Sequence, residues 1–465
     1  MRLSADTFYY GIGKMGEGVA ALVLIPVLTR AFSPTEFGLW DIVVTFFVIT
    51  TTVTSLALEV SLSAFYFETE DAVQRKTIAS TSVYFRFFSS FLVAIVIFLL
   101  APAISSLIFD APHYSRYFRI VAAAIPFFLG MNIFRQLLRV SFAPGKYNVV
   151  SIGYAALYAL FGIFLVVRMQ MGINGILLGM LAALVVASLV GAVFTRRFLA
   201  FQFSMSALRK MLSFGLPILP SLFACWIIDF SDRYFLARLS TLEQVGIYSA
   251  GAKISSIIIL FVTSFQMAWL PYALSIQHKE DARERYSRGL FLFLLICLIG
   301  GTGIVIFVKP ILILLTQPKY YGAEKVVGLL VLATIAYGAY LIMNIGLIIA
   351  KKTSFTSISV GVGALLNIAL NFMLIPHYGM LGAAAATLIS YLVAAAAIYW
   401  FANRWYPIDY RFSRIFKLVF LSICIMLIAS IIGFESSMFW DVIFSVILFI
   451  IFLFYIRRFF LSSIK

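Results

Sequence analysis

Long apolar runs are the feature that most restricts what this chain can fold into. A helix needs about 20 apolar residues to cross the hydrocarbon core of a bilayer, and 63% of the 465 residues are hydrophobic while only 12% are charged. Fourteen stretches meet this requirement. They lie near residues 8–29, 37–60, 82–108, 117–142, 148–167, 173–195, 212–236, 246–274, 289–315, 326–350, 354–375, 380–402, 415–433 and 438–456. The sequence therefore predicts an all-α polytopic membrane protein with about fourteen transmembrane helices.

The basic residues follow the loops between these runs. A net charge of +16 would suggest nucleic acid as the partner of a soluble protein. Here most of the 35 lysine and arginine residues fall in alternate loops, and cytoplasmic loops are the ones enriched in Lys and Arg. We therefore expect a multi-pass protein with both termini in the cytoplasm and no nucleic-acid partner.

Two short patterns recur at nearly the same offset and indicate an internal duplication. Arg30 and Arg238 each begin the pattern R-x7-G-x-aromatic, and the pair Gly172 and Gly175 is matched by Gly379 and Gly382. Each period contains six predicted spans, an even number, so both halves enter the membrane from the same side. The repeats are then parallel, and substrate sites in such transporters lie between the halves.

The predicted domains follow from this duplication. The first six-helix bundle spans 1–195, a cytoplasmic linker spans 196–211, the second six-helix bundle spans 212–403, and two additional transmembrane helices span 404–465. The linker is basic at both ends and apolar between, which is typical of a helix lying in the membrane interface. A plain connection between the bundles explains the same residues equally well.

Charged residues inside the predicted spans are the candidates for function, because ionisable groups at membrane depth are costly and usually face a cavity or each other. Asp229, Asp232, Arg233 and Lys253 lie in or beside the seventh and eighth spans, Lys14 lies in the first and Arg86 in the third. Asp229 and Arg233 are spaced i,i+4, so one interpretation is that they only neutralise each other. Arg86 has the alternative of snorkelling to the cytoplasmic surface. No acidic residue lies one helical turn from Lys253 in the sequence, which favours a polar patch lining a transport cavity.

Motifs for known chemistries do not occur in the sequence. It contains no HExxH, GxSxG, paired CxxC or Walker motif, and its three histidines fall in separate loops. The glycines around Lys14 spell GxGxxG, but a dinucleotide site needs a strand before this motif, whereas here it opens an apolar span. We therefore expect no catalytic residue, no metal site and no cofactor, and predict that the protein is not an enzyme.

The chain resembles the polysaccharide-transport (O-antigen flippase) family, which belongs to the multidrug/oligosaccharidyl-lipid/polysaccharide exporter superfamily. The resemblance covers the whole chain. It is carried by Leu28-Thr29-Arg30, Pro34 to Gly38, Phe214 to Pro217 with Pro220, Ser231 to Tyr234, Gly246 to Ser249 and Ala268 to Pro271. The Arg and Asp that the family carries after the proline pair of its seventh span match Asp232 and Arg233.

The resemblance implies a bacterial inner-membrane protein with two six-helix bundles in a V shape and two extra C-terminal helices. It implies a flippase that moves polyprenyl-pyrophosphate-linked oligosaccharide, the repeat unit of an O-antigen, capsule or exopolysaccharide, from the cytoplasmic to the periplasmic leaflet by alternating access. Membrane lipids, a glycan polymerase and chain-length proteins are the further partners it implies.

Chemistry agrees with this expectation, because cations on a cavity wall would offset the cost of moving a pyrophosphate through a low-dielectric layer. The candidate substrate-binding residues are Lys14, Arg86, Asp229, Asp232, Arg233, Lys253, Trp269 and Asn371, of which Trp269 and Asn371 would face the sugar. A drug or cation antiporter of the same superfamily is the alternative, although such cavities are usually acidic. A membrane-embedded polysaccharide polymerase or acyltransferase is a third, which the lack of a long external loop disfavours.

Overall fold

The computed structural model describes residues 16, 18, 22–431 and 438–458, and in these residues the chain forms helices and no strand. It divides into two compact units, Met1–Trp226 and Ile227–Lys465, and the boundary falls inside helix α9. Each unit is described here by itself.

The predicted spans are present. Twelve helices in the described residues are long and apolar enough to cross a membrane, and each corresponds to one predicted span. Two shorter apolar helices, Leu22–Ala31 and Asp441–Ile456, fall on the predicted first and fourteenth spans. The all-α polytopic fold class is therefore confirmed.

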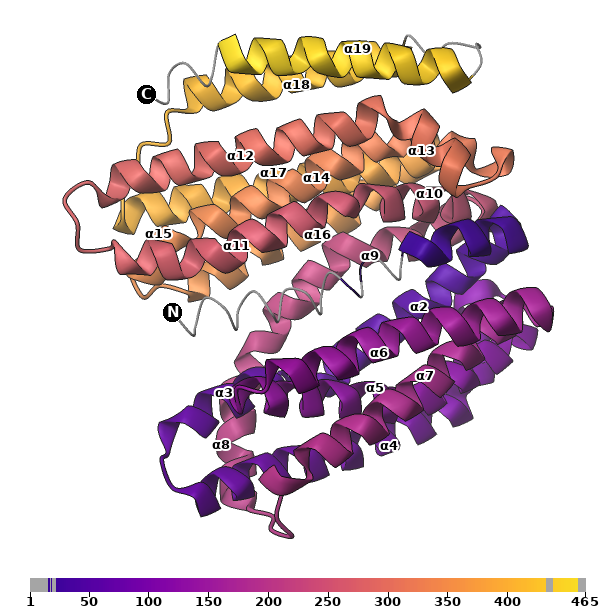
Figure 1. Ribbon diagram of the computed structural model, residues 1–465, viewed down its shortest axis with the longest axis vertical. Coiled ribbons are helices and arrows are strands. Elements are labelled where there is room, and N and C mark those ends of the chain that lie inside the picture. The colour runs from indigo at the N-terminus through magenta and orange to yellow at the C-terminus, as the bar shows by residue number, and fades with distance from the viewer. Residues whose placement is uncertain (1–15, 17, 19–21, 432–437, 459–465) are drawn as a thin grey trace. The chain divides into compact units, whose positions relative to one another are not determined.

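The first unit packs long helices around α5 and α7 (Figure 1). Its helices are α2 (Pro34–Ser55), α3 (Leu58–Glu68), α4 (Ala72–Phe109), α5 (Ser115–Val140), α6 (Pro144–Ile163), α7 (Gly172–Thr195), α8 (Met205–Gly215) and the start of α9 (Leu219–Leu239). The seventh predicted span is not one straight helix. A 3-10 turn, Leu216–Ile218, separates α8 from α9 and contains Pro217, which cannot donate a backbone hydrogen bond.

The second predicted span is also interrupted, between α2 and α3, and no proline or glycine in the sequence predicts this break. Leu56 and Ala57 both adopt left-handed backbone, with φ of 48° and 51°, a conformation unfavourable for residues with a Cβ. Gly215 of α8 lies against this break, because a Cβ there would sit 2.5 Å from the Leu56 carbonyl oxygen. The Ser61 hydroxyl also donates to the Met211 carbonyl at 2.8 Å, so tertiary contacts with α8 hold the break in place.

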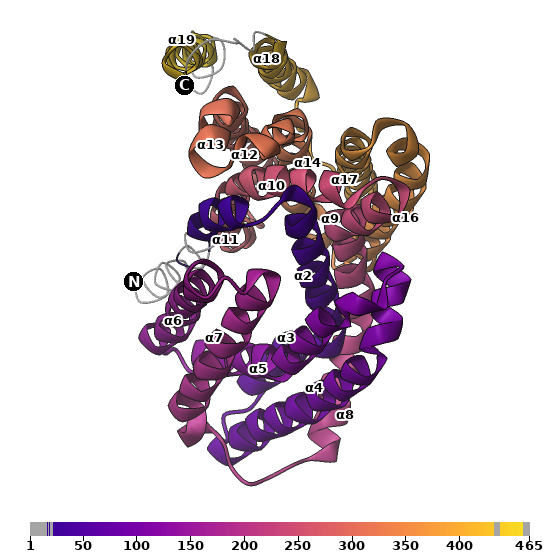
Figure 2. The same cartoon turned by 90° about the vertical axis from the view of Figure 1, so that its right-hand side faces the viewer.

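The second unit is built on α14 and α17, with α16 alongside α17 (Figure 2). After the end of α9, its helices are α10 (Leu242–Ser255), α11 (Ile257–Ser275), α12 (Ala282–Ile306), α13 (Val308–Leu315), α14 (Glu324–Met343), α15 (Ile345–Ile349), α16 (Ser354–Tyr378), α17 (Met380–Trp405), α18 (Phe412–Ile431) and α19 (Met438–Ile456). The predicted eighth span is divided at Ser256 into α10 and α11. The two C-terminal helices pack on α12.

Positions matched by the two sequence patterns share local geometry. Ser33 caps α2 by accepting from the Glu36 amide, and Thr241 caps α10 by accepting from the Gln244 amide, both at 3.2 Å. At the second pair of patterns both first glycines have left-handed backbone. Gly172, the first residue of α7, has a φ of +55°, and Gly379, directly before α17, has a φ of +53°.

The next glycines of these patterns repeat as well. A Cβ at Gly175 would meet the Leu165 main chain at 2.9 Å, and one at Gly382 would meet the Leu374 main chain at 2.5 Å. In each unit the glycine therefore lets a helix pack closely on the end of the one before it.

Candidate functional site

Asp232 of α9 is the centre of a charged group, the Asp232 group, which also contains Asp229, Arg233 and Tyr248. The Asp232 side chain is 1% exposed and Arg233 is 9% exposed. The Asp232 carboxylate accepts hydrogen bonds from the Arg233 backbone amide and from Arg233 Nη1, both at 2.8 Å, and from the Tyr248 hydroxyl of α10. A buried carboxylate is stable only when it is paired and hydrogen-bonded in this way.

Arg233 also ties the group to the first acidic residue of α9. Its Nη1 donates to the Asp229 main-chain carbonyl at 2.7 Å, and its guanidinium lies 5.1 Å from the Phe230 ring and 5.6 Å from the Tyr248 ring. The contact with Asp232 could not be expected from helical spacing, since neighbouring residues on a helix do not face each other. It forms because one carboxylate oxygen receives both the main-chain and the side-chain donor.

Asp229 has different surroundings. It remains exposed while Asp232 is buried, and its carboxylate accepts a hydrogen bond from the Tyr391 hydroxyl of α17. The patch therefore combines an accessible carboxylate with a buried ion pair about one helical turn away on α9.

Amide side chains of α16 extend the patch. The Asn367 carbonyl oxygen accepts from the Ser231 hydroxyl at 3.2 Å and from the Asn371 amide at 2.9 Å, and both asparagines are fully buried. Asn367 Nδ2 and Asn371 Oδ1 have no hydrogen-bond partner among the described residues. Asp229, Asp232, Arg233 and Asn371 are thus brought into one connected region of α9, α10, α16 and α17.

Two other predicted residues of this unit lie elsewhere. Lys253 is half-buried in the last turn of α10. Trp269 of α11 is buried against Phe265 and Tyr286, where Gly289 of α12 leaves space for its ring. The indole lines a cavity of about 580 Å³ that opens beside the charged first turns of α12.

Arg86 belongs to the first unit and does not snorkel to the surface. Its side chain is 0% exposed, and Nη2 lies 2.9 Å from Glu59 Oε1 of α3. Nε and Nη1 have no hydrogen-bond partner within the described part of the chain. The snorkelling alternative is therefore wrong, and Arg86 is a buried cation with one acidic partner.

Lys14 lies outside the described residues. Sequence reasoning missed Glu59, Tyr248, Tyr391 and the break before Glu59. Of these only Glu59 left a usable signal, because it is an acidic residue inside an apolar stretch, which by itself is a functional hypothesis. The tyrosines resemble the many other aromatic residues of the spans.

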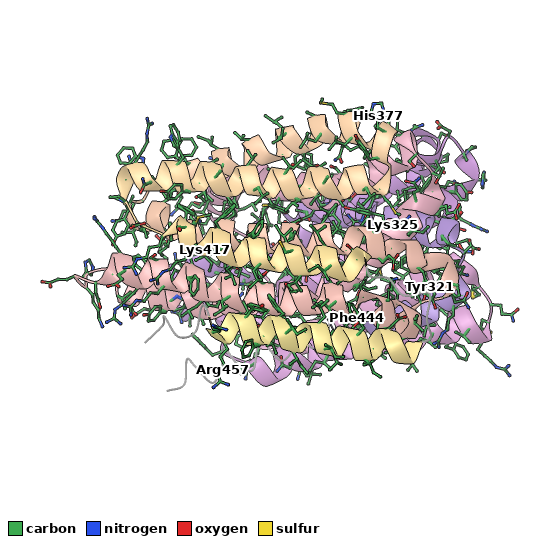
Figure 3. All side chains as sticks on the ribbon, turned by 90° about the horizontal axis from the view of Figure 1, so that it is seen from above. Tyr321, Lys325, His377, Lys417, Phe444 and Arg457 are labelled. Carbon is green, nitrogen blue, oxygen red and sulfur yellow. The ribbon has the colours of Figure 1, made fainter. Side chains whose placement is uncertain are left out.

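A further cavity lies between the C-terminal helices and the rest of the second unit. It measures about 370 Å³ and is lined by Lys309, Glu324, Lys325, Asp441 and Phe444, of which Lys325 and Phe444 are labelled in Figure 3. Within the described residues no group of three or more His, Cys, Asp or Glu side chains could hold a metal ion.

Comparison with known families now assigns the chain. A family model described as polysaccharide biosynthesis protein matches residues 3–277. The chain belongs to this family. A second model, MatE, matches residues 217–373, and both place the chain in the multidrug/oligosaccharidyl-lipid/polysaccharide exporter superfamily. The Asp232 group lies in the segment that both models match.

Solved structures show the same fold. The lipid II flippase MurJ in an inward closed conformation superposes with a TM-score of 0.78 at 15% identity, covering 98% of this chain and 99% of that one. An inward-facing multidrug resistance MATE family transporter gives 0.72 at 14% identity, covering 83% and 94%.

Two curated relatives are uncharacterized membrane proteins. YabM of Bacillus subtilis is 30% identical over 32% of this chain and 28% of its own length. MJ1068 of Methanocaldococcus jannaschii is 26% identical over 43% of this chain and 41% of its own length. The chain thus matches less than half the length of either.

Proposed function

We propose that this protein is a flippase for polyprenyl-pyrophosphate-linked oligosaccharide, which it moves from the cytoplasmic to the periplasmic leaflet of a bacterial inner membrane with both termini in the cytoplasm. The observation that carries the proposal is the match of residues 3–277 to the polysaccharide biosynthesis family. The fold shared with a lipid II flippase supports a lipid-linked substrate.

The Asp232 group supplies chemistry suited to such a substrate. A pyrophosphate needs donors and positive charge in a low-dielectric surrounding, and the planar guanidinium of arginine binds phosphate oxygens in pairs. Arg233 provides that group beside an accessible carboxylate and aromatic rings, and Asn367 and Asn371 provide amides for sugar hydroxyls. We propose Asp229, Asp232, Arg233, Lys253 and Asn371 as contacts of this substrate in the second unit, and Arg86 as a contact in the first.

Transport of this substrate makes a specific prediction in the host cell. Removing the protein should abolish a surface glycan and leave its lipid-linked precursor on the cytoplasmic leaflet. Measuring which leaflet exposes the precursor to an impermeant sugar-oxidising reagent tests the proposal. A host that keeps its surface glycans and shows no precursor would refute it.

A drug or cation antiporter is the second candidate, and one observation favours it. The MatE model covers residues 217–373, and the accessible Asp229 lies in that segment. Efflux of a cationic dye from vesicles containing the protein would support this candidate, and the same vesicles can be tested with lipid-linked sugar.

A further inference from the structure

The segment that joins α7 to α8 is fixed to the first unit by four hydrogen bonds to one face of α4. The Ala200 amide donates to Ser80 Oγ at 2.7 Å, and the Ser204 amide donates to Thr81 Oγ1 at 3.0 Å. The Thr77 hydroxyl donates to Gln202 Oε1 at 2.7 Å, and the Tyr84 hydroxyl donates to the Ala200 carbonyl at 3.0 Å. We call residues 196–210, which include the start of α8, the strap, and these hydrogen bonds hold it beside α4.

The length of α4 indicates where this strap lies relative to the membrane. Helix α4 has 38 residues, almost twice the about 20 that are needed to cross the hydrocarbon. The four hydrogen bonds reach Thr77, Ser80, Thr81 and Tyr84, near the start of α4, where the long apolar run of that helix is just beginning. The apolar run of α4 therefore predicts that these contacts lie where lipid headgroups meet the acyl chains.

The strap turns apolar side chains outward at this level. Phe201 is 103% exposed, and Phe203 and Met205 are about half exposed. The Phe201 ring lies 6.4 Å from the Tyr84 ring and otherwise points away from the protein. Large apolar side chains exposed side by side are unusual for a surface in water.

Basic side chains flank these apolar groups on both sides. Arg196, Arg197, Arg209 and Lys210 are all exposed, and none of them forms an ion pair with any residue that the structure describes. The exposed acidic residues Glu68, Glu70 and Asp71 lie before or at the start of α4, and Glu68 lines the same cavity as Lys210. The surface is thus apolar at its centre and net positive at its ends, which is the composition that binds anionic lipid surfaces.

We propose that Arg196–Lys210 is a binding surface for anionic phospholipid headgroups of the leaflet next to it, with Phe201, Phe203 and Met205 inserted among the acyl chains. The occupant is a lipid rather than a soluble protein because the apolar side chains sit at membrane level beside Tyr84. This site is separate from the Asp232 group and does not depend on which substrate is carried.

The test measures the depth of a spin label at Ser206, an exposed residue of the strap. Cys225, Cys297 and Cys424 are first replaced by alanine, the full-length protein carries Ser206→Cys, and it is reconstituted in phosphatidylcholine or in an equal mixture with phosphatidylglycerol. We expect collisions with membrane-dissolved oxygen to rise severalfold over collisions with a water-soluble nickel complex when phosphatidylglycerol is present. A label at Glu280→Cys, in the exposed loop between α11 and α12, is the matched control and should not change.

Two variants separate the parts of the proposal. Arg196→Gln, Arg197→Gln, Arg209→Gln and Lys210→Gln together should remove the dependence on phosphatidylglycerol. Phe201→Ser with Phe203→Ser keeps every charge and should leave the label exposed to nickel in both kinds of vesicle. A label that stays in water in both vesicles, or whose depth does not respond to phosphatidylglycerol, would overturn the proposal.

Discussion

Arg233 is held by an acidic neighbour, and this decides how its role can be tested. Arg233→Ala removes a proposed phosphate contact but also leaves Asp232 buried without its cation, which is strongly destabilising. Loss of export in that variant alone would be ambiguous. The variant Asp232→Asn with Arg233→Gln removes both charges and keeps a polar side chain at each position, so no buried charge is left unpaired and it should fold and reach the membrane.

We predict that this double variant abolishes glycan export while its amount in the membrane is unchanged, because Arg233 acts on the substrate. Arg233→Lys should keep partial export. Export is measured as surface glycan in cells that depend on the introduced gene. Normal export by the double variant would assign Arg233 a structural role.

Lys253 gives a second prediction at this scale. Lys253→Ala should abolish export and Lys253→Arg should retain part of it, because charge matters more than shape for a ligand that slides past. The same surface-glycan assay applies, with membrane amount as the control. If the alanine variant exports as much glycan as the wild type, Lys253 is not a contact of the substrate.

The buried pair of the first unit predicts a change in stability. Glu59→Gln leaves the fully buried Arg86 without a negative partner and should lower stability by about 3–5 kcal/mol. Glu59→Leu with Arg86→Met should recover most of that loss. The unfolding midpoint in detergent measures both, and Arg285→Gln, which breaks an exposed pair with Asp281, should leave it nearly unchanged.

At the scale of the helices, the break between α2 and α3 depends on Gly215. A Cβ there would meet a main-chain oxygen of Leu56 and lie 2.9 Å from the Ser61 hydroxyl. We therefore predict that Gly215→Ala lowers stability by about 1–3 kcal/mol through overpacking.

Gly153 of α6 is the control for this substitution, because a Cβ there would meet nothing within 4 Å. Gly153→Ala should raise stability by about 1 kcal/mol. Similar effects of the two substitutions on the unfolding midpoint would show that α8 does not support the break.

The positions and order of twelve of the fourteen predicted spans agree with long apolar helices in the described residues, because a membrane helix needs a long apolar run and little else. The break at Leu56 and Ala57 could not, since neither residue favours left-handed backbone and contacts with α8 impose it. The candidate site was predicted in part. Asp229, Asp232 and Arg233 stood out as charges in an apolar run, but their tyrosine partners come from helices that only the folded chain brings close.

For the whole molecule, the arrangement of basic loops predicts a topology. An impermeant thiol reagent should label single cysteines at positions 76, 210, 351 and 411 only from the cytoplasmic side, and those at 116, 319 and 435 only from the periplasmic side. Cys225, Cys297 and Cys424 must be replaced first. Labelling of position 210 or 351 from the periplasm would contradict both the orientation and the number of spans.

The measurement that tests the central claim most directly is transfer of lipid-linked sugar in vesicles that contain only this protein. The wild type should move a polyprenyl-pyrophosphate-linked sugar between leaflets, and the Asp232→Asn, Arg233→Gln variant should not. The leaflet is read by an enzyme added outside that acts on the exposed sugar. Vesicles in which the wild type moves no such lipid but expels a cationic dye would contradict the account and identify a drug or cation antiporter instead.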